Sequence, residues 1–157
     1  MKEIITHLAF KEEAEEAVRF YTSVIPDSRV TGTTYFRAGE PGKEGAVRTI
    51  RFELLGQEFL AVNGGPEFSF AEGTSLYVRC DTQREIDELW EQLSEGGQKQ
   101  VCGWLTDRYG MAWQIAPTVA EDYIYGQDPE AAQRVVEAIY RMTKIDLAEV
   151  ERAYRGS

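Results

Sequence analysis

The chain has 157 residues, of which 43% are hydrophobic and 28% charged, and its formal net charge is -10 at pH 7. A chain of this length and composition predicts one globular domain with a sizeable core. The negative charge argues against nucleic acid or an anionic membrane surface as a partner, because phosphate groups would be repelled. No apolar run approaches the roughly 20 residues of a membrane span, and the opening MKEIITHLAF lacks the apolar core of a secretion signal. Cys80 and Cys102 have no CxxC spacing and are interpreted as buried thiols, so we expect a cytoplasmic protein.

The first 66 residues predict a strand, a helix and then further strands. Residues 4–10 are rich in β-branched and apolar side chains, which favour a strand. Residues 12–24 place apolar side chains at helical spacing, and acidic residues occupy the first turn, where the helix dipole favours negative charge. The further strands are predicted at residues 29–39, 46–56 and 57–65, with the last two joined in a hairpin about Gly56.

The same order of elements begins again at residue 75. Residues 75–80 predict a strand, and residues 82–96 predict an amphipathic helix that Asp81 or Thr82 caps and that Gly96-Gly97 ends. Strands at 99–107 and 111–117 follow, turning about Tyr109-Gly110.

The two halves share a hairpin signature, because an aromatic residue stands three positions after each turn glycine, Phe59 after Gly56 and Trp113 after Gly110. This internal repeat predicts two βαβββ modules, at residues 1–66 and 74–117, within a single domain of residues 1–157. Neither module could bury its sheet alone. The predicted fold is therefore α+β, with paired modules forming a cup-shaped mixed sheet.

Residues 118–157 predict a C-terminal helical extension. Asp128-Pro129 is a typical helix start, with proline at the first helical position. Asp146 with Glu149 resembles a capping box for one more short helix. We expect this extension to pack on the sheet or to contact a second subunit, in preference to acting as a lid.

Several segments carry a resemblance to a known family. They are ITHLAFKEEAEEAVRFYTSVIPDSRV, GQEFLAVNGGP, CGWLTDRYGMAWQIAP and the tail DPEAAQRVVEAIYRMTKIDLAEVERA. Together they resemble the PhnB-like branch of the vicinal-oxygen-chelate superfamily, which has the glyoxalase/bleomycin-resistance fold. Members of this branch often carry the label 3-demethylubiquinone methyltransferase. We discount that activity, because S-adenosylmethionine usually requires a glycine-rich turn after the first strand, and KEEAEEA stands there instead.

The resemblance also implies where a metal would bind in related enzymes. A metal site normally needs three or more His, Cys or carboxylate ligands, and the implied positions supply one histidine and one amide. Only Glu53 or Glu58 could supply a further ligand and so complete a metal site. We therefore predict no bound metal and no cofactor. The four implied positions are His7, Leu60, Ser75 and Gln114.

His7 is the only histidine and the only side chain whose ordinary pKa lies near neutrality. It is the single candidate catalytic residue, as a general base. The alternative is a structural role in which Gln114 or Ser75 satisfies its hydrogen bonds.

Strand alternation assigns the side chains that face the cup. Aromatic surface beside cations suits a small anionic or aromatic ligand. Alternatively, Arg51 pairs with Glu53 or another carboxylate and the aromatic residues are core, as Trp90 and Trp113 are expected to be. The predicted ligand-binding residues are His7, Arg51, Leu60, Ser75, Tyr77, Arg79, Trp104 and Gln114.

The leading hypothesis is a protein that binds a small molecule in a metal-free cup, as a homodimer. The alternative is a divalent-metal-dependent lyase, isomerase or dioxygenase that uses His7, a glutamate and Gln114. A third possibility is a protein–protein regulator that uses only the fold.

Overall fold

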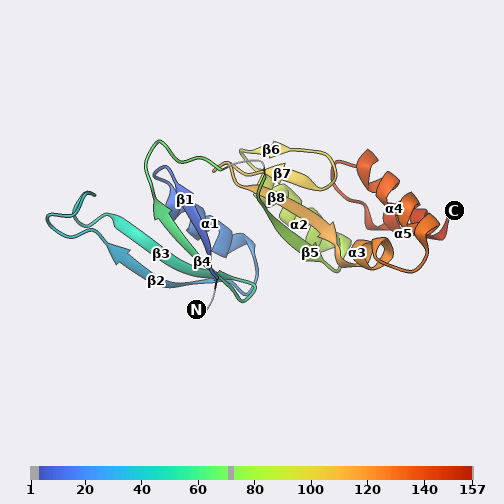
Figure 1. The fold of residues 1–157 in the computed structure, drawn as a ribbon, viewed down its shortest axis with the longest axis horizontal. Helices are drawn as coiled ribbons and strands as arrows, with labels where there is room; N and C mark the ends of the chain where they lie inside the picture. The colour runs from blue at the N-terminus through green and yellow to red at the C-terminus, as the bar shows by residue number, and fades with distance from the viewer. Residues whose placement is uncertain (1–3, 71–72, 157) are drawn as a thin grey trace. The chain divides into compact units, whose positions relative to one another are not determined.

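The computed structural model describes residues 4–70 and 73–156 and divides into two compact units between residues 70 and 71 (Figure 1). Each unit is described by itself. Among these described residues, no helix is long and apolar enough to cross a membrane.

The first unit is a four-stranded sheet with one helix on one face (Figure 1). The strand order is β1-β4-β3-β2, and only β1 and β4 are parallel. Both turn residues between β3 and β4, Leu55 and Gly56, have positive φ angles of 49° and 81°. Positive φ at both positions is the geometry of a tight two-residue hairpin turn. The elements are β1 (Thr6–Phe10), α1 (Ala14–Val24), β2 (Arg29–Tyr35), β3 (Val47–Leu54) and β4 (Gln57–Asn63).

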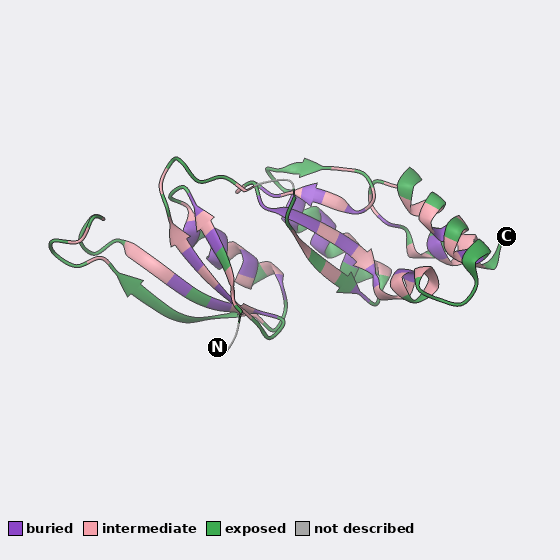
Figure 2. Ribbon diagram, viewed as in Figure 1, coloured by how far each residue is buried: buried purple, intermediate pink, exposed green. Residues whose placement is uncertain are grey.

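Alternate side chains of β1, β3 and β4 are buried, as period-two patterning requires, whereas every residue of the edge strand β2 is exposed (Figure 2). Phe52 and Phe59 lie opposite each other in register and stack with their ring centroids 5.2 Å apart. They form a core with Tyr21 and Val18 of α1. The opposite face of the sheet carries His7, whose side chain is exposed.

The second unit repeats this topology. Its strand order is β5-β8-β7-β6, with β5 and β8 parallel, and this order matches that of the first unit position by position. Trp90 and Trp113 are both buried, which confirms their prediction as core residues. The elements are β5 (Ser75–Cys80), α2 (Gln83–Ser94), β6 (Gln98–Lys99), β7 (Trp104–Thr106) and β8 (Ala112–Pro117).

The single strand predicted at 99–107 is wrong, because a turn breaks it into β6 and β7. Cys102 and Gly103 both have positive φ angles, 60° and 76°, which a strand cannot accommodate. Their amides bond instead to the carbonyls of Met142 and Thr143, at 2.8 Å each. The turn therefore attaches the C-terminal extension to the second unit.

The predicted helix starts in the second unit are confirmed, and of the two candidates for the cap of α2 it is Thr82 and not Asp81 that caps the helix. Thr82 caps α2 in a complete capping box with Glu85. Asp128 accepts from the amide of Ala131, and Asp146 accepts from the amide of Glu149. The helix α3 lies within the helical extension predicted at residues 118–157, but the sequence did not predict it as a separate helix. The three C-terminal helices are α3 (Thr118–Ile124), α4 (Pro129–Arg141) and α5 (Leu147–Arg155).

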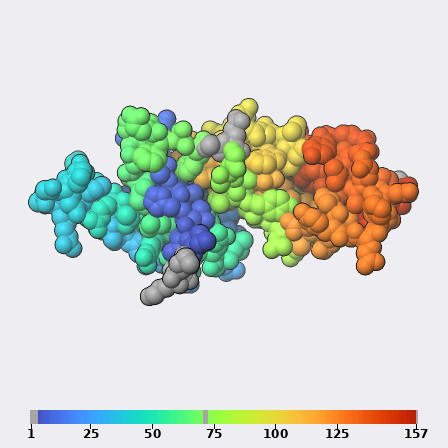
Figure 3. Space-filling view, in the orientation of Figure 1, coloured from blue at the N-terminus to red at the C-terminus, as the bar shows by residue number. Residues whose placement is uncertain are grey.

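The C-terminal helices have a small core of their own. Its buried members are Ala120, Val135, Ile145 and Val150. Two tyrosines, Tyr123 and Tyr154, stack beside it with centroids 3.8 Å apart. In the space-filling view these helices, coloured orange to red, gather at one end of the second unit, in agreement with the bonds to the 102–103 turn (Figure 3).

The α+β fold with two βαβββ modules and C-terminal helices is thus confirmed. The strands form two separate four-stranded sheets, one in each unit.

Candidate functional site

Three side chains form a row across the sheet of the second unit. Tyr77 of β5 lies opposite Gln114 of β8, and Gln114 lies opposite Trp104 of β7. Residues in register on neighbouring strands point to the same face. The flanking residues of β8, Trp113 and Ile115, are buried. The row therefore occupies the face opposite the buried face of β8.

Gln114 is held by a hydrogen bond to Ser75. The Nε2 atom donates to the hydroxyl of Ser75 at 2.9 Å. With that orientation the Oε1 atom of the amide remains an acceptor. Two predicted site residues are thus brought together, and Ser75 acts by orienting Gln114.

The row lines a cavity of about 260 Å³, which we call the Gln114 cavity. A cavity of roughly 150 Å³ binds benzene, and drug-sized ligands occupy about 300 Å³ or more. The volume therefore fits a molecule of one or two rings. None of the lining side chains is charged. They are Tyr77, Cys102, Trp104, Gln114, Ala116, Pro117, Ala120, Ile124, Val136, Ile139, Tyr140 and Ile145.

The Tyr77 phenol stays protonated at physiological pH. Burial raises the pKa of Tyr77 to about 12, and the charge of Glu121 and a hydrogen bond to it add to the effect. Glu121 also pairs with Arg79, with 3.5 Å between Nη1 and Oε2. Arg79, a predicted ligand-binding residue, does not line the cavity. Its cation faces a carboxylate of its own chain.

The two cysteines differ in accessibility. Cys80 is buried, and burial together with Glu85 and Asp81 raises its pKa to about 12. Cys102 is only partly buried and lines the Gln114 cavity, although burial raises its pKa as well. The prediction of two buried thiols is therefore correct for Cys80 and wrong for Cys102, because the turn at 102–103 brings that residue toward the surface.

The remaining predicted site residues belong to the first unit. His7 of β1 lies opposite Leu60 of β4, and Leu60 lies opposite Arg51 of β3. Arg51 pairs loosely with Glu58, with 3.9 Å between Nη1 and Oε1. The pairing predicted as an alternative is thus present, although with Glu58 and not Glu53.

These residues do not fit a metal ion. Leu60 has no donor atom, and Ser75 is already bonded to Gln114. Glu53 pairs with Arg29, with 2.7 Å between their charged atoms. Within residues 4–70 and 73–156, no group of three or more His, Cys, Asp or Glu side chains is placed to hold a metal.

The turn after the first strand does not fit a nucleotide-type cofactor either. Residues 11–13 are Lys-Glu-Glu, and no glycine lies between β1 and α1. Backbone amides could not approach a ligand there as they do in a glycine-rich turn.

The sequence did not predict that the C-terminal helices form one wall of the Gln114 cavity. Ile124, Val136 and Ile139 line the cavity opposite the sheet. Their apolar spacing indicates a buried helix face, and only the position of the helices shows that part of that face borders a cavity.

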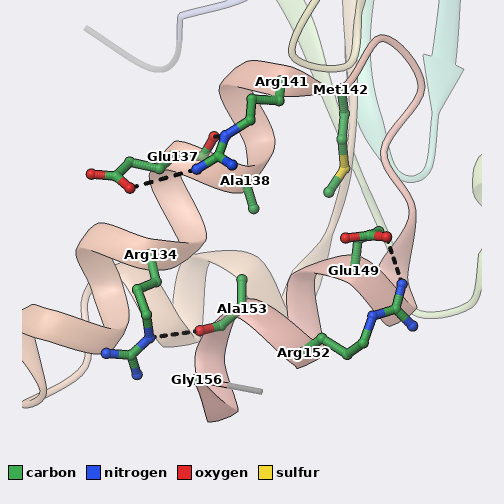
Figure 4. Close-up of a pocket in the computed structure, with 9 residues that line it drawn as sticks. All are labelled: Arg134, Glu137, Ala138, Arg141, Met142, Glu149, Arg152, Ala153 and Gly156. Atoms are coloured by element: carbon green, nitrogen blue, oxygen red, sulfur yellow. Dashed lines mark hydrogen bonds and ion pairs between the residues drawn. The ribbon is translucent and has the colours of Figure 1, made fainter.

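A second cleft, of about 600 Å³, lies between α4 and α5 (Figure 4). Its arginines are engaged within the protein. Arg141 pairs with Glu137 and Arg152 with Glu149, at 3.6 and 2.6 Å. Arg134 donates to the carbonyls of Ala153 and Tyr154, both at 2.9 Å. The charged side chains of this cleft therefore have a structural role, in which Arg134 caps the C-terminal end of α5.

Replacing Arg134 with methionine should lower the free energy of unfolding by about 1–2 kcal/mol, because two carbonyls at the end of α5 lose a charged donor. Urea denaturation followed by tryptophan fluorescence measures this change. Arg84→Met is the control, because it removes an exposed pair with Glu88 on α2. This change should cost less than about 0.5 kcal/mol. Equal costs would contradict the capping role.

Comparison with known proteins relates this fold to one family. The model of the family described as 3-demethylubiquinone-9 3-methyltransferase matches residues 2–116. The solved PhnB protein from Bacillus cereus is 36% identical, with a TM-score of 0.69, and the match covers 74% of this chain and all of that one. The match to the PA1353 protein from Pseudomonas aeruginosa is 22% identical, covers 74% and 98% of the two chains, and has a TM-score of 0.63.

A more distant structure shares the fold alone. The fosfomycin resistance protein FosX from Listeria monocytogenes, solved with Mn(II) and sulfate, is 11% identical with a TM-score of 0.54. That match covers 73% of this chain and 91% of FosX.

No curated protein matches. The family model ends at residue 116, so it does not cover the tail in which we also saw the resemblance. Over residues 2–116, the chain belongs to the PhnB-like family described as 3-demethylubiquinone-9 3-methyltransferase, within the glyoxalase/bleomycin-resistance fold.

Proposed function

We propose that this chain binds a small, uncharged aromatic molecule in the Gln114 cavity. The observation that carries the proposal is the cavity of about 260 Å³, with Trp104 and Tyr77 on its wall and the Gln114 amide among them. Apolar walls with a few polar groups are typical of small-molecule sites. The proposal makes Trp104 and Tyr77 the surfaces for the ring, and Gln114 the acceptor for a donor on the ligand.

An anionic ligand is less suited to this cavity than the sequence suggested. An anion that enters loses hydration, and no lining side chain is a cation that could compensate. Arg79 is paired with Glu121. The row of His7, Leu60 and Arg51 in the first unit remains a prediction of ligand contact, and a homodimer and a cytoplasmic location remain proposals. The metal-dependent alternative gains no support from the donor set described above.

The first test is calorimetric titration with indole, benzofuran and benzoate. We expect indole to bind with a Kd of about 0.1 mM or lower, which its small size permits. Benzofuran has nearly the same shape but no N–H donor and should bind about five- to tenfold more weakly, while benzoate should not bind measurably. If none of the three binds in the millimolar range, the proposal is wrong.

Two variants assign the binding to the cavity. Trp104→Ala should weaken indole binding about tenfold, because it removes an aromatic contact worth about 1 kcal/mol together with buried area. Gln114→Leu should weaken indole and leave benzofuran unchanged. Tyr125→Ala is the control, since Tyr125 is exposed and does not line the cavity. An unchanged Kd in both cavity variants, with the fold intact by circular dichroism, would contradict the proposal.

Cys102 gives an independent readout of the same site. Bound indole should slow the alkylation of Cys102 by iodoacetamide, because this thiol lines the cavity. Cys80 is buried and its pKa is raised to about 12, so it should stay unmodified and serve as an internal reference. Mass spectrometry of the two cysteine peptides measures the extent of alkylation at each thiol over time. Equal Cys102 rates with and without saturating indole would place the ligand elsewhere.

A further inference from the structure

The Gln114 cavity is built from two parts of the chain that differ in their relation to the family. The sheet side, with Tyr77, Trp104 and Gln114, lies within the region that the family model matches. More than half of the lining residues follow residue 116, where that match ends. The opposite wall, formed by α3 and α4, therefore comes from a part of the chain that the match does not cover.

This wall is firmly attached to the second unit. Besides the bonds from the 102–103 turn, the side chain of Gln83 on α2 donates to the carbonyl of Ile145 at 3.1 Å and accepts from the amide of Leu147 at 2.7 Å. Lys144 forms an ion pair with Asp87, which is also on α2, at 2.6 Å. These contacts tie the α4–α5 connection and the first residue of α5 to α2. A wall held in this way presents a fixed shape to a ligand.

The chemistry of the wall is restrictive. Val136, Ile139 and Ile145 contribute only aliphatic surface, and Tyr140 adds an exposed phenol at the rim. Closely packed aliphatic side chains do not rearrange freely, so an oversized ligand costs energy. The sheet supplies the aromatic surface and the amide, while the wall limits the length of whatever lies against them.

We propose that α4 is the specificity-determining wall of the Gln114 cavity, with Ile139 and Tyr140 restricting the ligand to a neutral molecule of one or two fused rings. This inference rests on the proposed function and adds the part of the chain that selects the ligand. It assigns a binding role to residues outside the family match, so relatives that lack an equivalent of α4 would accept other molecules at the same sheet.

The test compares indole with 4-phenylphenol, which is also neutral and carries a donor but has two linked rings and is longer. In the unaltered protein, 4-phenylphenol should bind at least tenfold more weakly than indole. Ile139→Ala should raise the affinity for 4-phenylphenol relative to indole by at least fivefold, because it removes three carbon atoms from the wall. Ile139→Trp should fill the space and abolish indole binding.

Ile139 also packs against the core of the C-terminal helices, so Tyr140→Ala is a second variant that does not disturb that core. It should shift the ratio of the two affinities in the same direction. Gln133→Ala, an exposed change on the same helix away from the cavity, is the matched control and should leave the ratio unchanged.

The outcomes separate the two proposals. If indole binds and depends on Trp104, but the ratio is unchanged in Ile139→Ala and Tyr140→Ala, the specificity role of α4 is wrong and the proposed function stands. If the unaltered protein binds neither probe, both proposals are wrong. A shift of the ratio in both variants and not in Gln133→Ala would support the wall.

Discussion

Replacing Asp107 with alanine is expected to lower the free energy of unfolding of the second unit by about 4 kcal/mol. Asp107 is only 3% exposed, and its carboxylate accepts hydrogen bonds from two backbone amides and from one indole. Its Oδ1 atom binds the amides of Tyr109 and Met111 at 2.8 and 3.0 Å, and its Oδ2 atom binds the indole nitrogen of Trp113 at 2.9 Å. Alanine would leave buried donors without this acceptor, and each such loss costs about 1–3 kcal/mol.

Urea denaturation followed by tryptophan fluorescence measures this change, because all three tryptophans of the chain lie in the second unit. Trp113→Phe is the partner variant and removes one donor together with part of the ring. The double variant should cost less than the sum of the two single changes, since both remove the same bond. A cost below about 1 kcal/mol for Asp107→Ala would show that this carboxylate does not hold the turn between β7 and β8.

Replacing Gly103 with alanine should cost about 3 kcal/mol or more, whereas the same change at Gly110 should cost about 1 kcal/mol. Both glycines have positive φ angles, 76° and 86°, which penalise any side chain by about 1–2 kcal/mol. At Gly110 an added Cβ would meet nothing within 4 Å. At Gly103 it would lie 2.5 Å from the carbonyl oxygen of Ile115 and 3.1 Å from a side-chain carbon of Ile145.

The difference between the two variants therefore isolates the steric contact from the backbone preference. The same denaturation experiment measures both. Amide hydrogen exchange adds a local readout, because Gly103 donates to the carbonyl of Thr143 and accepts from the amide of Ile115. Gly103→Ala should speed exchange at these amides. Equal costs for the two variants would mean that the 102–103 turn adjusts freely and does not fasten the C-terminal helices.

The sequence by itself predicted most of the helices and strands and the buried faces of several of them. Strand alternation and helical spacing are local properties, so they predicted β5 at residues 75–80 and the buried side of α2. Cap residues act on amides of their own first turn, and for this reason Asp128 and Asp146 could be identified without any tertiary information, and the cap of α2 could be narrowed to Asp81 or Thr82. The repeated order of elements was also readable, because each module carries its own hairpin glycine.

The partners of the polar side chains depended on tertiary contacts. The sequence placed Tyr77, Trp104 and Gln114 on one face, but not the bond from Gln114 to Ser75, which joins residues 39 positions apart. It suggested two cations for a ligand, and the structure pairs Arg51 with Glu58 and Arg79 with Glu121. Such pairings depend on strand register and on where a distant helix lies, and neither is encoded in a short segment.

The break at residues 100–103 and the position of the C-terminal helices were decided by the tertiary structure in the same way. KQVCGWLTD has the composition of a strand, yet its centre turns so that two amides can reach the carbonyls of Met142 and Thr143. The same contacts place Ile139 and Tyr140 at the Gln114 cavity, which they border. The sequence thus determined which surfaces are apolar. Only the tertiary structure decided which of them meet and which leave a space between them, because packing joins residues far apart in the chain.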